Sequence, residues 1–147
     1  MVAADERSRS RGVDLRQVSL NLLLDTHIFI WAVSLPERLS TRAELLLSDG
    51  RNRLHLSTSS IWEISLKHSL GKENFIFPEE AVVAGIEHLG CQIVNVNARH
   101  AFALFRLPAI HRDPFDRILL AQAWTDNLLL VTADRRLSEY PEVQTVW

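Results

Sequence analysis

The sequence predicts an α/β fold: a single domain in which a central parallel sheet is flanked by helices on both faces. Three observations lead to this prediction. The 147 residues suit one domain with a sizeable core. Strand-like apolar runs alternate with helix-like segments along the chain, which is typical of a parallel sheet. The run Leu20–Leu24 holds four leucines and one asparagine, as expected of a strand that is buried on both faces.

Two helices are expected between the first and second strands. The segment Thr26–Ser34 continues the apolar pattern and stops near Pro36, since proline breaks helices. Ser40 is the expected N-cap of the next helix, because its hydroxyl can accept a hydrogen bond from the first helical turn. That helix extends through Ser48 and ends at Asp49–Gly50.

The second strand is predicted at Leu54–Ser57. The hydroxyls of Thr58-Ser59-Ser60 can cap a helix, which is predicted over Ile61–Leu70 and is closed by Gly71. A short extended piece, Asn74–Phe77, is expected after it.

Pro78-Glu79-Glu80 opens a further helix, because proline suits the first turn and acids favour the positive end of the helix dipole. This helix runs to Leu89. The third strand is predicted at Cys91–Val96, and Asn97 is the expected cap of a helix that extends through Phe105.

The last part of the chain repeats the alternation. Asp113-Pro114 starts a long helix that continues to about Asp126. The consecutive apolar residues Leu128–Thr132 predict the fourth strand. A short helix is expected after Asp134, and Val143–Val146 is expected to form a final edge strand.

Residues 1–19 are expected to lie outside the domain, which spans residues 20–147. They are rich in Arg and Ser and lack apolar periodicity, so we expect a mobile N-terminal tail. Asp5, Glu6 and Asp14 argue against an Arg-rich transit peptide. The choice of an upstream start codon would produce such an extension as well.

Composition narrows the function classes. The net charge of -2 gives no overall basic signature, so nucleic-acid binding would depend on local Arg and Lys clusters. A single cysteine, Cys91, excludes an internal disulfide and a multi-cysteine metal site. Together with the lack of a secretory signal, this favours the cytoplasm. No apolar run approaches the roughly 20 residues needed to cross a bilayer, so no membrane role is expected.

Four acidic residues occupy comparable places in the predicted fold. Two follow strands directly, and two are expected in the first turn of a helix: Asp25, Asp134, Glu63 and Asp116. In a parallel sheet all carboxyl ends of strands lie at one edge, where ligands bind in open α/β sheets. The four carboxylates are therefore expected to meet at this edge.

Each acid also has a purely structural explanation. Carboxylates at helix N-termini accept backbone N–H groups, and Asp113 with Asp116 resembles a capping box. Glu63 and Lys67 form a well-ordered i,i+4 pair. The conjunction of four acids favours a metal site instead, since crowded carboxylates repel one another unless a cation offsets their charge. Oxygen ligands suit Mg²⁺ or Mn²⁺, and the chain lacks the Cys/His spacing of a zinc site. Such a site serves phosphoryl chemistry.

Four segments carry a family resemblance: LLLDTHIFIW, SSIWEISLKHSLGK, HRDPFDRILLAQA and LLLVTADRRL. In this order and spacing the chain resembles the PIN-domain family, and more narrowly the VapC toxins of bacterial type II toxin–antitoxin pairs. The resemblance covers Leu20–Trp147. It implies a parallel sheet sandwiched by helices, Mg²⁺- or Mn²⁺-dependent endoribonuclease activity, and inhibition by a VapB-type antitoxin.

The resemblance also implies roles for individual residues. Asp25, Glu63 and Asp116 match the acidic metal-binding core, and Asp134 matches a more variable fourth acid. The family places a hydroxyl near the site where this chain has Thr132. Asp113 matches a recurrent acid of the subgroup, although capping of the helix is sufficient to explain it.

Several further residues allow two interpretations. Thr26 can orient the carboxylate of Asp25 or cap a helix, and His27 can lie near substrate or be a half-buried imidazole. Arginines flank the third and fourth acids and can bind phosphate or pair with neighbouring acids: Arg112, Arg117, Arg135 and Arg136. Trp31 and Trp62 are expected in the core.

Rival functions remain open at this stage. The same acids could serve a phosphatase or a DNA nuclease, or a PIN nuclease in RNA processing outside a toxin–antitoxin system. Haloacid-dehalogenase-like phosphatases need a second aspartate at the position of His27. A second rival is an inactive PIN-like module that binds antitoxin or RNA. The helices Thr26–Ser34 and Ser40–Ser48 carry more apolar residues than one core face needs, so we expect them to hold an antitoxin or a second copy in a homodimer.

Overall fold

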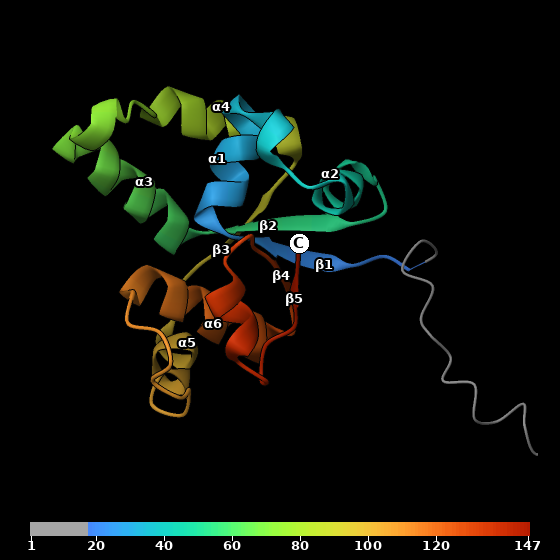
Figure 1. The fold of residues 1–147 in the computed structure, drawn as a ribbon, viewed down its shortest axis with the longest axis vertical. Helices are drawn as coiled ribbons and strands as arrows, with labels where there is room; N and C mark the ends of the chain where they lie inside the picture. The colour runs from blue at the N-terminus through green and yellow to red at the C-terminus, as the bar shows by residue number, and fades with distance from the viewer. Residues whose placement is uncertain (1–17) are drawn as a thin grey trace, which may run out of the picture.

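The computed structural model describes residues 18–147, so the predicted tail lies outside the described residues except for Val18 and Ser19. Within this range the chain forms one five-stranded sheet in the order β3-β2-β1-β4-β5, with every neighbouring pair parallel (Figure 1). The strands are β1 (Asn21–Leu24), β2 (Arg53–Ser57), β3 (Gln92–Val94), β4 (Leu129–Val131) and β5 (Thr145–Val146). The predicted parallel α/β fold is confirmed.

Helices connect the strands and cover both faces of the sheet (Figure 1). They are α1 (Thr26–Ser34), α2 (Thr41–Ser48), α3 (Thr58–Leu70), α4 (Glu79–Leu89), α5 (Ala98–Ala103) and α6 (Pro114–Asp126). Short 3₁₀ turns lie at Pro36–Arg38, Lys72–Asn74 and Arg135–Glu139.

The central strand β1 supplies side chains to two cores. Leu22 and Leu24 belong to the core beneath α1, α3 and α4, whereas Leu23 belongs to the core beneath α5 and α6. All three leucines are fully buried, which follows from the alternation of side chains along a strand that is covered on both faces. This burial explains the unbroken leucine pattern before Asp25.

The start of α3 differs from the prediction. The helix begins at Thr58, directly after β2, and its N-cap is Ser57, whose hydroxyl accepts a hydrogen bond from the backbone N–H of Ser59. The expected start at Ile61 is wrong, because the last residue of the strand itself provides the cap. Glu63 therefore lies in the second turn, beyond the first-turn N–H groups that need an acidic partner.

The other differences concern segment ends. β3 and α5 are shorter than predicted, and Asn74 closes a 3₁₀ turn instead of starting an extended piece. Glu73 and Asn74 both have φ of 56°, so a left-handed pair reverses the chain between α3 and α4. Phe77 then contacts Phe29 edge to face, with ring centroids 6.3 Å apart, which ties this connection to the core.

The apolar residues of α1 are used inside the domain. Ile28, Phe29 and Ile30 are buried, and α4 packs closely over them at Gly85, where an added Cβ would lie 2.6 Å from Cγ2 of Val33. The apolar surplus expected on this helix is reduced to its last turns, where Trp31, Ala32 and Val33 are half-buried. On α2, Leu45 does remain exposed.

Among the helices of residues 18–147, none is both long enough and apolar enough to cross a bilayer.

Candidate functional site

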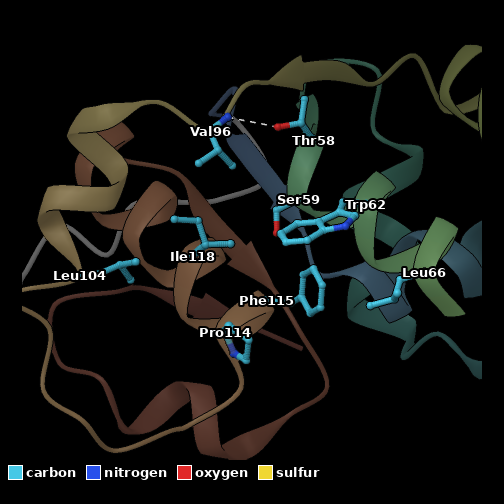
Figure 2. Close-up of a pocket in the computed structure, with 9 residues that line it drawn as sticks. All are labelled: Thr58, Ser59, Trp62, Leu66, Val96, Leu104, Pro114, Phe115 and Ile118. Atoms are coloured by element: carbon cyan, nitrogen blue, oxygen red, sulfur yellow. Dashed lines mark hydrogen bonds between the residues drawn. The ribbon is translucent and has the colours of Figure 1, made fainter.

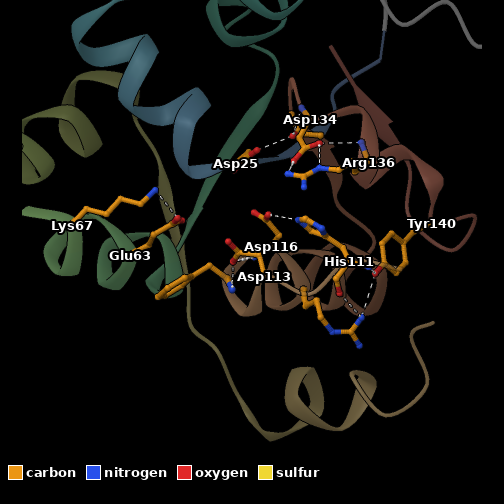
Figure 3. Close-up of polar contacts among 12 residues, drawn as sticks. Asp25, Glu63, Lys67, His111, Asp113, Asp116, Asp134, Arg136 and Tyr140 are labelled. Carbon is orange, nitrogen blue, oxygen red and sulfur yellow. Dashed lines mark hydrogen bonds and ion pairs between the residues drawn. The ribbon is translucent and has the colours of Figure 1, made fainter. Parts of the chain in front are cut away.

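A pocket of about 370 Å³ lies at the carboxyl edge of the sheet, and all four predicted acids line it (Figure 3). Asp25 follows β1, Asp116 lies in the first turn of α6, and Asp134 follows β4. Glu63 reaches the pocket from α3. The predicted convergence of acids from distant parts of the chain is thus present. The other residues lining the pocket are His27, Trp31, Lys67, Asp113, Ala133 and Arg136.

Asp25 occupies the N-cap position of α1 but makes no side-chain capping hydrogen bond. Its Oδ2 instead accepts a hydrogen bond of 2.7 Å from the hydroxyl of Thr132. Burial raises the pKa of Asp25, the Thr132 hydrogen bond opposes this rise, and the nearby Glu63 adds to it. Thr26, the other candidate partner, directs its hydroxyl to Ser60, 2.9 Å away. The capping explanation for the Asp25 carboxylate is therefore wrong.

Glu63 is buried and has a basic partner on its own helix. Nζ of Lys67 lies 3.0 Å from Oε2 of Glu63, so the predicted i,i+4 pair forms. Because both side chains line the pocket, the pair belongs to the acidic site and not only to the helix surface.

Asp116 turns its side chain into the pocket instead of completing a capping box. Asp113 alone caps α6, accepting hydrogen bonds from the backbone N–H groups of Phe115 and Asp116. Oδ2 of Asp116 lies 2.7 Å from Nε2 of His111 and is hydrogen-bonded to it. Burial raises the pKa of Asp116 to about 6; the His111 hydrogen bond opposes the rise, and the charge of Asp25 adds to it.

His111 is the site residue that sequence reasoning missed. Its imidazole is buried, and its backbone N–H donates a 2.7 Å hydrogen bond to the hydroxyl of the fully buried Tyr140. Donor atoms of His111, Asp116 and Asp134 lie within 4.8 Å of one another, a grouping that differs from the predicted acid set by including an imidazole. The available signal was the position of His111 in HRDPFD, just before the cap of α6.

Asp134 differs from the other three acids because an arginine engages both of its oxygens. Nε of Arg136 donates to Oδ1 at 3.1 Å, and Nη2 donates to Oδ2 at 2.8 Å (Figure 3). These hydrogen bonds lower the pKa of Asp134.

The remaining predicted residues divide into those at the pocket and those away from it. His27 lines the pocket and is exposed, so the half-buried interpretation is wrong. The guanidinium of Arg117 donates to the backbone carbonyls of Leu104, Pro108 and His111 and to the hydroxyl of Tyr140, and so anchors the loop before α6. Arg135 is exposed and does not line the pocket.

The donor set fits a divalent cation. Carboxylates from four acids line the pocket, and burial makes the ionised forms of Asp25 and Asp116 costly without a compensating charge. Mg²⁺ and Mn²⁺ prefer oxygen ligands of this kind. Thr132 and His111 fix one oxygen of Asp25 and of Asp116 respectively, which orients the carboxylates as partners of metal ligands do in known sites.

A second hollow is apolar and separate from the acids (Figure 2). It has a volume of about 690 Å³ and is lined by Thr58, Ser59, Trp62, Leu66, Val96, Leu104, Pro114, Phe115 and Ile118. The indole of Trp62 contacts the ring of Phe115 edge to face, with centroids 5.1 Å apart, and is 64% exposed. The core placement expected for Trp62 is therefore wrong.

Comparison with known proteins gives consistent results. The family described as PIN domain matches residues 22–143. The chain is 28% identical over 131 residues to Ribonuclease VapC22 of Mycobacterium tuberculosis, covering 86% of this chain and 98% of that protein.

Two solved structures share the fold. One is VapBC2 from Rickettsia felis bound to a DNA fragment from their promoter, with a TM-score of 0.64 and 18% identity over 86% of this chain and 98% of the other. The other is DNA-bound VapBC from Salmonella typhimurium, with a TM-score of 0.60 and 19% identity over 86% of this chain and 97% of the other.

Proposed function

Because the chain belongs to the PIN-domain family, we propose that it is a metal-dependent endoribonuclease and the toxin of a VapBC-type toxin–antitoxin pair. The observation that carries this proposal is the convergence of Asp25, Glu63 and Asp116 in one pocket. These acids come from three elements, and neither Asp25 nor Glu63 is needed for helix capping.

In the proposed reaction, Asp25, Glu63 and Asp116 would hold Mg²⁺ or Mn²⁺, and Asp134 lies beside them in the same pocket. An ion held there would supply a water of lowered pKa and positive charge for phosphodiester hydrolysis. The hydroxyl of Thr132 keeps one oxygen of Asp25 in place. The imidazole of His111 does the same for Asp116.

RNA is the substrate we favour, because the relative VapC22 is named a ribonuclease and covers most of this chain. Two alternatives use the same fold: a PIN nuclease that acts on DNA or in RNA processing outside a toxin–antitoxin system, and an inactive module that binds antitoxin or RNA. The single half-buried cysteine, Cys91, is consistent with the cytoplasmic location we propose.

The test is cleavage of total RNA and of duplex DNA by the wild type and by Asp25→Asn, each with Mg²⁺, Mn²⁺ or EDTA. We expect metal-dependent cleavage of RNA by the wild type and loss of more than about 99% of it in the variant, since ion binding requires the carboxylate. Asp49→Asn, at the opposite edge of the sheet, is the control and should cleave normally. Full RNA cleavage by Asp25→Asn would refute the proposed site, and cleavage of DNA alone would favour the first alternative.

The proposed partners are a VapB-type antitoxin and a second copy of this chain. The two structural relatives are VapBC complexes, which supports the antitoxin as a partner.

We assign the apolar groove of Figure 2 as the surface that binds the second copy of this chain. Phe102, in α5, and Phe105, next to Leu104 in the following turn, are 64% and 88% exposed. A face with both an apolar hollow and projecting aromatic rings can pair with itself about a two-fold axis.

A further inference from the structure

Each of the four acids has a side-chain partner, and these partners contact the carboxylates in two different ways. The hydroxyl of Thr132, the ammonium of Lys67 and the imidazole of His111 each contact one oxygen of their acid. Arg136 contacts both oxygens of Asp134, and its backbone N–H donates a further 3.0 Å hydrogen bond to Oδ1. Asp134 is therefore the acid of which both carboxylate oxygens accept hydrogen bonds from its partner.

This engagement makes Asp134 a poor metal ligand. A cation bound to its oxygens would have to displace the guanidinium fork or lie in contact with its positive charge. Asp25, Glu63 and Asp116 each keep an oxygen that their side-chain partner does not contact. The divalent ion is thus expected on these three acids.

Arg136 itself is well placed to bind an anion. It lines the acidic pocket, and its side chain is 65% exposed. A guanidinium has five N–H groups, and the two bonds to Asp134 use two of them. The fork of Arg matches the geometry of phosphate, and a fixed guanidinium loses little entropy on binding.

We propose that Arg136 binds the substrate phosphate next to the metal and that Asp134 positions Arg136 instead of coordinating the ion. This inference rests on the proposed nuclease function. It assigns the phosphate contact to Arg136 and not to Arg117, whose guanidinium anchors the loop before α6.

The chain contains a matched copy of the same clamp. Arg51 and Asp49 repeat every contact at the same distances: 3.0 Å from the backbone N–H, 3.1 Å from Nε and 2.8 Å from Nη2. This copy precedes β2 at the opposite edge of the sheet. An Asp-x-Arg clamp is thus a local structure in this chain, and its position in the acidic pocket is what gives Arg136 access to substrate.

The first measurement is Mn²⁺ binding by calorimetry to the wild type, Asp25→Asn and Asp134→Asn. Asp25→Asn should lose binding, because it removes a ligand. Asp134→Asn should retain Mn²⁺ binding, with a much smaller loss of affinity than Asp25→Asn, since it removes no ligand and only leaves the charge of Arg136 less offset. Loss of Mn²⁺ binding in Asp134→Asn, to the extent seen in Asp25→Asn, would overturn the inference.

The second measurement is the affinity for a fluorescein-labelled single-stranded RNA of mixed sequence in Ca²⁺, as a function of salt concentration. Arg136→Gln should reduce the slope of log K against log salt by about 0.7, the value for one lost phosphate contact on a single strand. Arg51→Gln carries the same charge change and should leave the slope unchanged. Equal slopes for Arg136→Gln and the wild type would overturn the inference.

The third measurement is a cleavage cycle with Mg²⁺ using Asp134→Asn, Arg136→Gln and the double variant. If Asp134 acts through Arg136, the double variant should be no slower than Arg136→Gln alone. A further loss of rate in the double variant would assign Asp134 a separate role. A wild type that neither binds Mn²⁺ nor cleaves RNA would refute the proposed function itself, and the inference with it.

Discussion

At the residue scale, the four acids of the pocket are energetically unlike one another. Burial raises the pKa values of Asp25 and Asp116, whereas Arg136 lowers that of Asp134. The two raised carboxylates therefore cost the metal-free fold stability when they are ionised. The lowered one contributes stability when it is ionised.

Asp116→Asn should raise the melting temperature of the metal-free protein at pH 7. The folded pKa is about 6 against an ordinary value of 3.8, so the wild type loses stability as the pH rises from about 4 to 6 and the carboxyl ionises. The neutral variant avoids this loss, which we place at about 1–2 kcal/mol after allowance for solvent screening. Thermal unfolding of both proteins across pH 4 to 8 measures this loss. The difference in melting temperature between the variant and the wild type should vanish near pH 4.

Asp134→Asn is the contrasting control and should lower the melting temperature at pH 7, because it removes a carboxylate stabilised in its ionised form. A rise in the melting temperature of both variants would contradict the opposite pKa shifts of Asp116 and Asp134.

Ion binding requires the ionised carboxylate of Asp116. The Mn²⁺ affinity and the rate of RNA cleavage should therefore both fall as the pH drops through about 6.

His111→Ala should weaken Mn²⁺ binding by about tenfold, because it releases the carboxylate of Asp116. His111→Gln can place an amide N–H near the position of Nε2 and should recover most of the affinity. The control is His100→Gln, since His100 is buried and pairs with Asp126 at 2.9 Å outside the pocket. Calorimetry gives the readout, and equal affinities in the Ala variant and the wild type would contradict a positioning role.

The acids of this site were predictable from sequence, but their donors were not. The places of Asp25 and Asp134 after strands, and of Asp116 at a helix start, follow from local patterns. Thr132 was indicated only by family resemblance, and His111 by nothing that periodicity can detect. A loop histidine reaches its carboxylate through the path of the chain, which depends on the tertiary contacts of Arg117 and Tyr140.

At the scale of elements, the helices that connect the strands pack on one another as well as on the sheet. Helix α4 approaches α1 closely because Gly85 has no side chain at the contact. Sequence patterns located nearly every element, but the start of α3 was placed late because several hydroxyls in a row can each cap a helix. Residue propensity does not distinguish Ser57, Thr58 and Ser59 as the N-cap of α3. The position at which β2 ends makes Ser57 the N-cap.

Gly85→Val should destabilise the fold by about 1–3 kcal/mol, the usual cost of overpacking a filled contact. The added Cβ would lie 2.6 Å from Cγ2 of Val33 and 3.0 Å from Cζ of the buried Phe29. Denaturant unfolding measures the change. Ala84→Val puts the same side chain on an exposed position of α4 and should cost less than about 1 kcal/mol. Equal effects of the two substitutions would contradict the close packing of α4 on α1.

At the scale of the whole molecule, two separate surfaces are proposed to bind partners: one binds RNA and the other binds a second copy of the chain. The acidic pocket lies at the carboxyl edge of the sheet, and the apolar groove lies between α3 and α6. The sequence predicted a partner surface on the first two helices, where Leu45 of α2 is exposed; the apolar groove is a second candidate that hydropathy alone did not indicate.

Leu66→Glu should convert the proposed dimer into a monomer, because it puts a charge into the apolar groove. Leu45→Glu is the control: it adds the same charge on α2, at a side chain that is 66% exposed. Light scattering coupled to size exclusion gives the mass of each variant. A wild type that is monomeric, or a Leu66→Glu variant that stays dimeric, would refute the assignment of this groove.

The hydrogen bond between Thr132 and Asp25 joins positions 107 residues apart in the chain. A ribosome that translates this message therefore makes Asp25 early and its partner close to the end. An unfinished or prematurely terminated chain carries the first acids but no assembled pocket, since β4 has not yet paired with β1. For a protein proposed to be harmful to its own cell, this order of synthesis delays activity until almost the whole chain has been made.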